Sequence, residues 1–312
     1  MKVLISGASG FVGKNLTVFL KDNGHKIIAV SRNPETECEI SWEQLLADYV
    51  STSDVDVFVH LAGKAHDLRN TSDASEYFEI NTELTKRFFD LFIKSDAATF
   101  IFMSSVKAAA DTVEGELKEE VDPDPKTAYG QSKQQAEQYI LHSDLPANKR
   151  VLILRPCMIH GPGNKGNLNQ LYNFVKKGIP YPLAAFDNKR SFLSMVNLSF
   201  IINNLIINTD VPGGIYNLSD DESLSTNTVI QLLNEAIGRK SRLLKINRSI
   251  INSVAVLGDK FKLPLNSEKL KKLTESYMVS NKKIKNALKI SRLPVSSAEG
   301  LKITFKSFLQ DK

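Results

Sequence analysis

The chain has little cysteine and no long apolar run. Its two cysteines, Cys38 and Cys157, cannot build a disulfide framework, and neither belongs to a Cys-x-x-Cys pair that would suggest metal or redox work. The apolar stretch 196–208 is interrupted by Asn197, Asn203 and Asn204 and is far shorter than the roughly 20 residues that a membrane-spanning helix needs. These absences predict a cytoplasmic protein with no membrane span and no metal site.

What remains is ordinary globular composition. Hydrophobic residues make up 42% of the 312 residues and charged residues 24%, so the chain can bury a substantial core. The first residues, MKVLISGASGFVG, have too short an apolar run for an export signal, and we expect them to open the fold as a strand. At this length the chain can form one large domain or two modest ones.

The charge is unevenly distributed. Residues 239–312 hold 18 Lys/Arg against 5 Asp/Glu, so the rest of the chain is net acidic although the whole carries +5. This basic end could face a diphosphate or an acidic surface, or it could be a lysine-rich helical face that only meets water. We expect no nucleic-acid partner.

Apolar, β-branched runs alternate with helical patterns through the first half of the chain. Near-continuous apolar strands that alternate with helices predict an α/β fold with a doubly wound parallel sheet, whose ligand lies at the carboxyl ends of the strands. The expected strands are Val3–Ser6, Ile27–Val30, Val55–His60, Phe100–Met103 and Val151–Leu154, and the expected helices are Asn15–Asp22, Ile80–Lys94 and Ser132–Leu141.

The pattern changes after Pro156, where a loop rich in Gly, Pro and Asn precedes a helix at about 168–177. We therefore expect a dinucleotide-binding domain made of residues 1–160 and about 190–212. A smaller substrate-binding domain, largely C-terminal, would be built from about 161–189 and 213–312.

Gly7, Gly10 and Gly13 form a G-x-x-G-x-x-G pattern directly after the first strand and directly before a helix that begins near Phe11. Without side chains the turn can close, and the backbone N–H groups and helix N-terminus can approach a pyrophosphate. At the end of the second strand, Ser31 and Arg32 stand where NAD-binding folds usually carry an acid. Because a guanidinium can bind a ribose 2′-phosphate, we predict NADP or NAD as cofactor, with NADP favoured.

Tyr129 and Lys133 lie four residues apart, so a helix places both on one face. Tyr172 and Lys176 have the same spacing, but they follow an irregular loop, and we assign them to an ordinary amphipathic helix. Tyr129 instead follows the strand that ends near Ser105. We expect Lys133 and the helix start to lower the pKa of the Tyr129 phenol, which then exchanges a proton with a substrate oxygen that Ser105 orients.

Several motifs in order resemble the extended short-chain dehydrogenase/reductase superfamily, in its NAD-dependent epimerase/dehydratase branch that acts on nucleotide sugars. The resemblance runs through nearly the whole chain and implies the Rossmann fold. It is carried by Gly7-Ala-Ser-Gly-Phe-Val-Gly13, Asp56-Val-Phe-Val-His-Leu-Ala-Gly63, Asn81, Ser104-Ser105, Tyr129 to Lys133, Arg155-Pro156, Gly161-Pro-Gly163 and Arg190-Ser-Phe-Leu.

The resemblance also implies roles for single residues. It implies that Ser105, Tyr129 and Lys133 are catalytic. It also implies that Tyr129 and Lys133 bind the cofactor, together with Gly7, Gly10, Phe11, Val12, Gly13, Ser31, Arg32, Leu61, Ala62, Gly63 and Asn81. The nucleotide-sugar substrate would meet Ser105, Lys107, Asn167 and Arg190. Without the resemblance, Asn81 would be interpreted as a helix cap, Arg190 as a surface charge and His60 as a strand-end residue.

Positions at which this sequence differs from the motifs of the branch limit the reactions that we expect. Val106 and Lys107 occupy the places where the resembling 4,6-dehydratases carry an Asp-Glu pair, so dehydration is not expected. The segment 108–110 is all alanine where 4-epimerases have a tyrosine, which argues against epimerisation. The run from Arg155 to Asn197 looks most like reductases of UDP-4-keto-6-deoxy-N-acetylhexosamines. We predict C4 ketoreduction, with a 4-epimerase as the alternative, a non-catalytic NAD(P)-binding regulator as a remote one, and a homodimer as the assembly.

Overall fold

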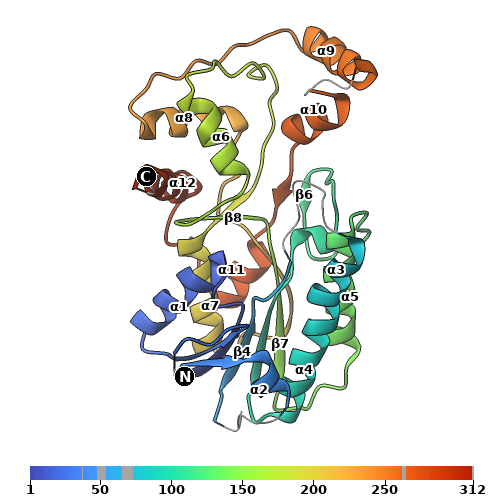
Figure 1. Cartoon of the computed structure of the whole chain (residues 1–312), viewed down its shortest axis with the longest axis vertical. Coiled ribbons are helices and arrows are strands. Elements are labelled where there is room, and N and C mark those ends of the chain that lie inside the picture. The colour runs from blue at the N-terminus through green and yellow to red at the C-terminus, as the bar shows by residue number, and fades with distance from the viewer. Residues whose placement is uncertain (37, 48–53, 65–72, 262–264, 311–312) are drawn as a thin grey trace.

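The computed structural model describes residues 1–36, 38–47, 54–64, 73–261 and 265–310 (Figure 1). Its main sheet has seven parallel strands in the order β10-β7-β5-β4-β1-β2-β3. The order reverses direction at β1, which is the signature of a doubly wound sheet, so the predicted Rossmann fold is confirmed. The strands are β1 Lys2–Ser6, β2 Lys26–Ser31, β3 Glu39–Ser41, β4 Val57–His60, β5 Thr99–Met103, β7 Arg150–Pro156 and β10 Gly214–Leu218.

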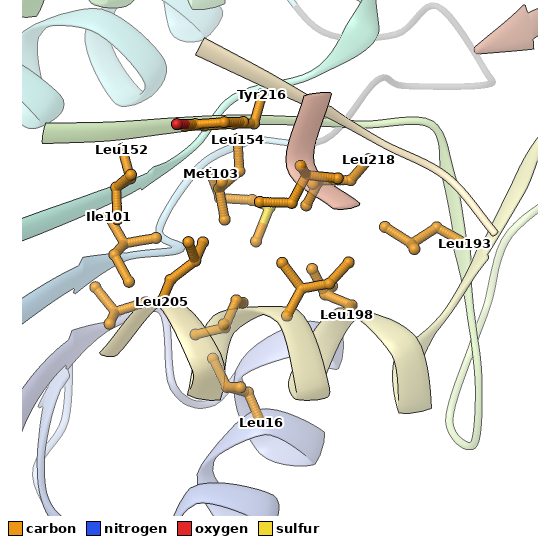
Figure 2. Close-up of a cluster of buried hydrophobic side chains, with 14 of the residues drawn as sticks. Leu16, Ile101, Met103, Leu152, Leu154, Leu193, Leu198, Leu205, Tyr216 and Leu218 are labelled. Atoms are coloured by element: carbon orange, nitrogen blue, oxygen red, sulfur yellow. The ribbon is translucent and has the colours of Figure 1, made fainter. Parts of the chain in front are cut away.

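Helices cover both faces of this sheet. On one face α1 (Phe11–Asp22), α7 (Met195–Ile207) and α11 (Lys282–Leu288) enclose one buried cluster, in which Leu205 of α7 lies beside Ile101 of β5 and Leu198 lies further along the helix (Figure 2). On the other face α2 (Trp42–Leu46), α4 (Leu84–Lys94) and α5 (Ala128–His142) enclose a second cluster rich in phenylalanine. The strands β1, β4, β5 and β7 are buried on both sides, which explains why their sequences are almost continuously apolar.

The five expected strands are present, but β3 and β10 were not predicted. We expected residues 213–312 to lie in the second domain, whereas Gly214–Leu218 pairs with β7 and completes the sheet. The strand follows α7, which returns the chain to the sheet edge as a parallel crossover connection requires. The remaining domain boundaries stay a prediction.

A third buried cluster lies outside the sheet and joins α6 (Asn167–Lys176), α8 (Thr226–Ala236) and α12 (Ser297–Gln310). Here Tyr172 packs against Phe308 with ring centroids 5.5 Å apart, so this tyrosine belongs to an ordinary amphipathic helix, as expected. Further from the sheet lie α9 (Arg248–Phe261) and α10 (Ser267–Thr274). Two small parallel pairs, β8 (Met158–His160) with β9 (Phe192–Ser194) and β6 (Glu116–Leu117) with β11 (Met278–Val279), connect the two regions.

The carboxyl ends of β1, β4 and β5 meet at one edge of the sheet, because neighbouring parallel strands end together. The segments that follow them are the glycine turn, residues 61–64 and residues 104–105, in that order. These three segments and α5, which covers the sheet beside β5, therefore define the place to look for a site. Within the described part of the chain, no helix has the length and hydropathy needed to cross a bilayer.

Candidate active site

The glycine turn requires the absence of side chains. Gly7 has φ +74°, and a Cβ there would lie 2.6 Å from the backbone nitrogen of Ala62. A Cβ on Gly13 would lie 2.2 Å from the carbonyl oxygen of Gly7, so α1 can pack against the turn only with glycine at this position. Gly10 caps α1 and offers no side-chain hydrogen bond to the first-turn N–H groups. This closed turn, and a helix start whose N–H groups have no side-chain cap, fit the diphosphate of a dinucleotide.

Replacing Gly13 with Ala tests this packing. We expect the free energy of unfolding to fall by about 1–3 kcal/mol, because the methyl group forces α1 away from the turn. Dinucleotide affinity should fall as well, since the helix start moves. The matched control is Gly10→Ala, because φ at Gly10 is −74° and the nearest atom to an added Cβ is 3.3 Å away. Urea unfolding of both variants gives the comparison, and equal losses would contradict the packing argument.

Two hydrogen bonds fix the segment after β4 beside the turn. The Leu61 N–H donates to the Ser6 carbonyl over 3.0 Å, and the Ala62 N–H donates to the Ser6 hydroxyl over 3.3 Å. His60 is fully buried and contacts the Ser6 hydroxyl at 2.5 Å and the Thr85 hydroxyl at 2.9 Å. Burial, followed by the nearby Lys133 charge, lowers the pKa of His60 well below its usual value. His60 is thus a neutral structural residue that fixes the strand ends.

Asn81 joins the segment after β4 to α5, the helix that carries Tyr129 and Lys133. It lies inside a π-helical turn, Glu79–Glu83, that connects α3 (Ala74–Phe78) to α4, so it is not the helix cap that one interpretation gave. Its amide exchanges hydrogen bonds with the Lys64 backbone over 2.7 and 3.1 Å and donates to the Ser132 hydroxyl over 3.0 Å. Single π-helical turns are frequent at functional sites, and this one turns Asn81 inward.

Ser105 and Tyr129 come together as the sequence predicted. Ser105 lies just beyond β5, where its hydroxyl accepts the Lys107 N–H over 3.1 Å, and it also hydrogen-bonds the Tyr129 phenol. Tyr129 is in the first turn of α5, whose N-cap Thr127 accepts the Gly130 N–H. Tyr77 packs edge-on against the phenol ring with centroids 6.1 Å apart, so the ring is held by two neighbours.

Lys133 lies one turn below Tyr129, at the centre of the same group. Its ammonium donates to the Met103 carbonyl over 2.9 Å, and a Cβ on Gly63 would lie 3.0 Å from its Nζ and 2.9 Å from the Asn81 Oδ1. Glycine at 63 therefore leaves a gap that Lys133 and Asn81 both face. The structure brings Gly63, Asn81, Ser105, Tyr129 and Lys133 together.

The expectation about proton affinity was wrong for Tyr129. Burial is the largest effect and raises the pKa of Tyr129, and the hydrogen bond from Ser105 only partly opposes it. Burial also lowers the pKa of Lys133 to about 8, against a smaller opposing effect of Glu137. The phenol is thus a proton donor at neutral pH, which suits the reduction of a carbonyl group.

A pH profile follows from Lys133. Below about pH 8 the side chain is charged, and above it the ammonium loses its proton, so we expect kcat/KM to fall about tenfold per unit on the alkaline side. The Tyr129 pKa is raised, so the phenol does not produce this limb. In Lys133→Arg the charge persists throughout, and whatever activity remains should show no limb near pH 8. A flat wild-type profile would rule out this assignment.

A buried ion pair behind the site was missed by sequence reasoning. Glu137 and Arg155 are each 2% exposed, with the Arg155 Nε 2.9 Å from the Glu137 Oε1, and the Ser104 hydroxyl donates to the same carboxylate. The signal available in the sequence was that Glu137 lies four residues after Lys133, which places both side chains on the same face of α5. The pair ties α5 to β7 and to the residue before Ser105.

Three further residues predicted to bind substrate, Lys107, Arg190 and Asn167, have contacts or positions of their own. The Lys107 ammonium donates to the Asp111 carbonyl over 2.7 Å and lies 4.4 Å from the centre of the Tyr277 ring. Arg190 is no free surface charge, because it donates to the Glu275 carbonyl over 3.2 Å and to the Lys272 carbonyl beside the end of α10. Asn167 is exposed at the first position of α6. Their roles toward substrate stay a prediction.

Ser31 ends β2, and its hydroxyl donates to the Asn33 carbonyl over 3.1 Å, while Arg32 is exposed beside it. Phe11, Val12 and Leu61 are partly buried against the large core cluster. Ser31 lines one pocket with Ala8 and Ser9 of the glycine turn, on the side where a dinucleotide ribose would lie.

A doubly wound sheet with a glycine turn and a Ser-Tyr-Lys set defines the class of extended short-chain dehydrogenases. Residues 3–218 match the NAD dependent epimerase/dehydratase family, and the chain belongs to that family. It is an enzyme of this family, and its cofactor is NAD or NADP.

The relatives of this chain include both an epimerase and a reductase. The chain is 30% identical to a UDP-glucose 4-epimerase of Vibrio cholerae, over 99% of this chain and 95% of the relative. It is 25% identical to a GDP-6-deoxy-D-mannose reductase of Pseudomonas aeruginosa, over 74% of this chain and 79% of the relative. The solved structure of MoeE5 with UDP-glucose and NAD has a TM-score of 0.76 at 19% identity, covers 100% of this chain and 99% of that one, and shows the shared fold.

Proposed function

We propose that this enzyme reduces the 4-keto group of a nucleotide sugar, namely a UDP-4-keto-6-deoxy-N-acetylhexosamine. One observation carries the proposal: a Ser105–Tyr129 pair lies above Lys133, and the residues after Ser105 are Val106 and Lys107. Eliminating water would need a separate acid and base at those two places. Valine can be neither, and the Lys107 ammonium donates to the Asp111 carbonyl.

The chain's own groups can perform the proton half of a reduction. Tyr129 donates its phenolic proton to the carbonyl oxygen as that oxygen becomes a hydroxyl. Ser105 donates a hydrogen bond to the same oxygen and holds it in line, and Lys133 supplies positive charge that stabilises the phenolate left on Tyr129. The dinucleotide, when bound at the glycine turn, supplies the hydride.

The test is a spectrophotometric assay with UDP-4-keto-6-deoxy-GlcNAc. Adding this ketone with NADPH or NADH should consume the reduced cofactor in a 1:1 ratio with alcohol product. UDP-GlcNAc is the matched control, because it lacks the ketone and should consume none. No loss of absorbance at 340 nm with the keto-sugar under either cofactor would remove the proposal.

A 4-epimerase is the second candidate, and the full-length likeness to the Vibrio cholerae 4-epimerase favours it. The buried Ala108 and Ala109 argue against it, because the second tyrosine that resembling 4-epimerases carry in this segment is missing. An epimerase would interconvert UDP-GlcNAc and UDP-GalNAc with no net consumption of cofactor. Chromatography of the two sugar nucleotides after incubation with catalytic NAD distinguishes the activities.

We further propose that the cofactor is NADP(H). The support is Arg32, an exposed guanidinium directly after β2 where an acid would hydrogen-bond the NAD ribose. Arg32→Ala should weaken NADPH binding about tenfold or more while NADH affinity changes little. Calorimetric Kd values for both cofactors give the result, and tighter NADH than NADPH binding by the wild type would overturn the preference. A homodimer remains a prediction for light scattering.

A further inference from the structure

An exposed apolar stripe runs along α9. Ile250, Val254, Leu257 and Phe261 follow one another at intervals of four, three and four residues, so they share one face of the helix. Each is between 42% and 64% exposed, which is unusual for four neighbouring large apolar side chains. We call these four residues the α9 stripe.

The α9 stripe is separate from the face that α9 uses to pack. Ile251, Ala255 and Gly258 form that buried face. A Cβ on Gly258 would lie 1.8 Å from the Leu265 carbonyl oxygen, which shows how closely the chain leading into α10 approaches this face. In Figure 1, α9 lies at one end of the long axis of the molecule with α10 beside it. The helix therefore has a second apolar face that the described residues leave exposed.

Positive charge is concentrated in the segment of the chain that carries α9 and α10. Residues 239–273 contain ten Lys/Arg and only two Asp/Glu. The exposed basic side chains include Arg242, Lys245, Lys260, Lys269 and Lys271. This concentration of charge lies on elements other than α5, which carries Tyr129 and Lys133.

We propose that α9 and α10 dock the enzyme onto an anionic phospholipid surface. The α9 stripe would enter the boundary between headgroups and acyl chains, and the exposed lysines of α9 and α10 would meet lipid phosphates. A second copy of the chain fits less well, because two such basic surfaces repel each other. Nucleic acid fits less well too, because it offers no apolar layer for four exposed aliphatic and aromatic side chains.

Vesicle flotation with the full chain tests the proposal. We expect binding to vesicles of equimolar phosphatidylcholine and phosphatidylglycerol, and at least about tenfold weaker binding to pure phosphatidylcholine. The double variant Leu257→Ser/Phe261→Ser should lose at least about tenfold in partition onto the anionic vesicles. Lys269→Gln and Lys271→Gln should each lower the partition by about fivefold, and high salt should lower it further.

The matched control is Val18→Ser/Leu141→Ser, which removes two equally exposed apolar side chains from α1 and α5 and should bind like the wild type. Circular dichroism melts of both double variants should match the wild type, since none of the four side chains is buried. Equal binding to neutral and anionic vesicles, or unchanged binding of the α9 variant, would overturn the proposal. So would a concentration-dependent oligomer, or a tight complex with DNA, that the α9 variant abolishes while vesicle binding is absent.

Discussion

Replacing Tyr129 with Phe is expected to lower kcat by about 100- to 10,000-fold while cofactor binding persists. The substitution removes one oxygen, and with it the proton donor that Ser105 hydrogen-bonds. The ring still fits between its neighbours, because Tyr77 contacts it edge-on. Steady-state kinetics and a dinucleotide titration of the same variant separate the loss of chemistry from any loss of binding.

The chain supplies a matched control for this experiment in its second Tyr-x-x-x-Lys pattern. Tyr172 is buried against Phe308 in the third cluster, away from the carboxyl ends of β1, β4 and β5. Tyr172→Phe should therefore leave kcat unchanged. If Tyr129→Phe turned over like the wild type, the Ser-Tyr-Lys assignment would fail, and a non-catalytic NAD(P)-binding regulator would gain support.

Replacing Glu137 with Ala should lower the free energy of unfolding by about 3–5 kcal/mol. The loss is large because the variant leaves the Arg155 guanidinium charged, buried and without its carboxylate. The Ser104 hydroxyl loses its acceptor as well. Urea unfolding followed by tryptophan fluorescence and circular dichroism measures the change.

Glu83→Ala is the control for this second experiment. Glu83 also pairs with a cation, Lys86, at 2.8 Å, but both side chains are partly exposed and three residues apart on a helix. Such a pair contributes about 0.2–0.5 kcal/mol, so the control should be nearly silent. Similar losses in the two variants would show that burial does not determine the strength of the Glu137–Arg155 pair.

The sequence predicted the sheet well because its signals are local. A strand buried on both faces must be apolar at nearly every position, as Phe100–Met103 is, and this holds whichever strands lie beside it. The missed strands are short or lack that pattern. Glu39–Ser41 has three residues, and Gly214–Leu218 includes a glycine and an asparagine, so each depends on its neighbour in the sheet for its conformation.

The candidate site also has a part that the sequence predicts and a part that it does not. Two spacings could be recognised in the sequence, that of the glycines at 7, 10 and 13 and that of Tyr129 and Lys133. Both depend on turn or helix geometry, which acts over a few residues. The contacts of Asn81 with Lys64 and Ser132 join residues 17 and 51 positions apart, and no local pattern indicates them.

The sequence by itself determined the fold class and the family, and it indicated the groups that we propose carry the chemistry, because each depends on residue type and short spacing. Only the tertiary structure decided how those groups ionise and what holds them. The Tyr129 pKa is raised and the Lys133 pKa lowered by burial, and Glu137 meets Arg155 across two elements. Burial is a property of the packed molecule, since the desolvation of one side chain is set by residues distant in the chain.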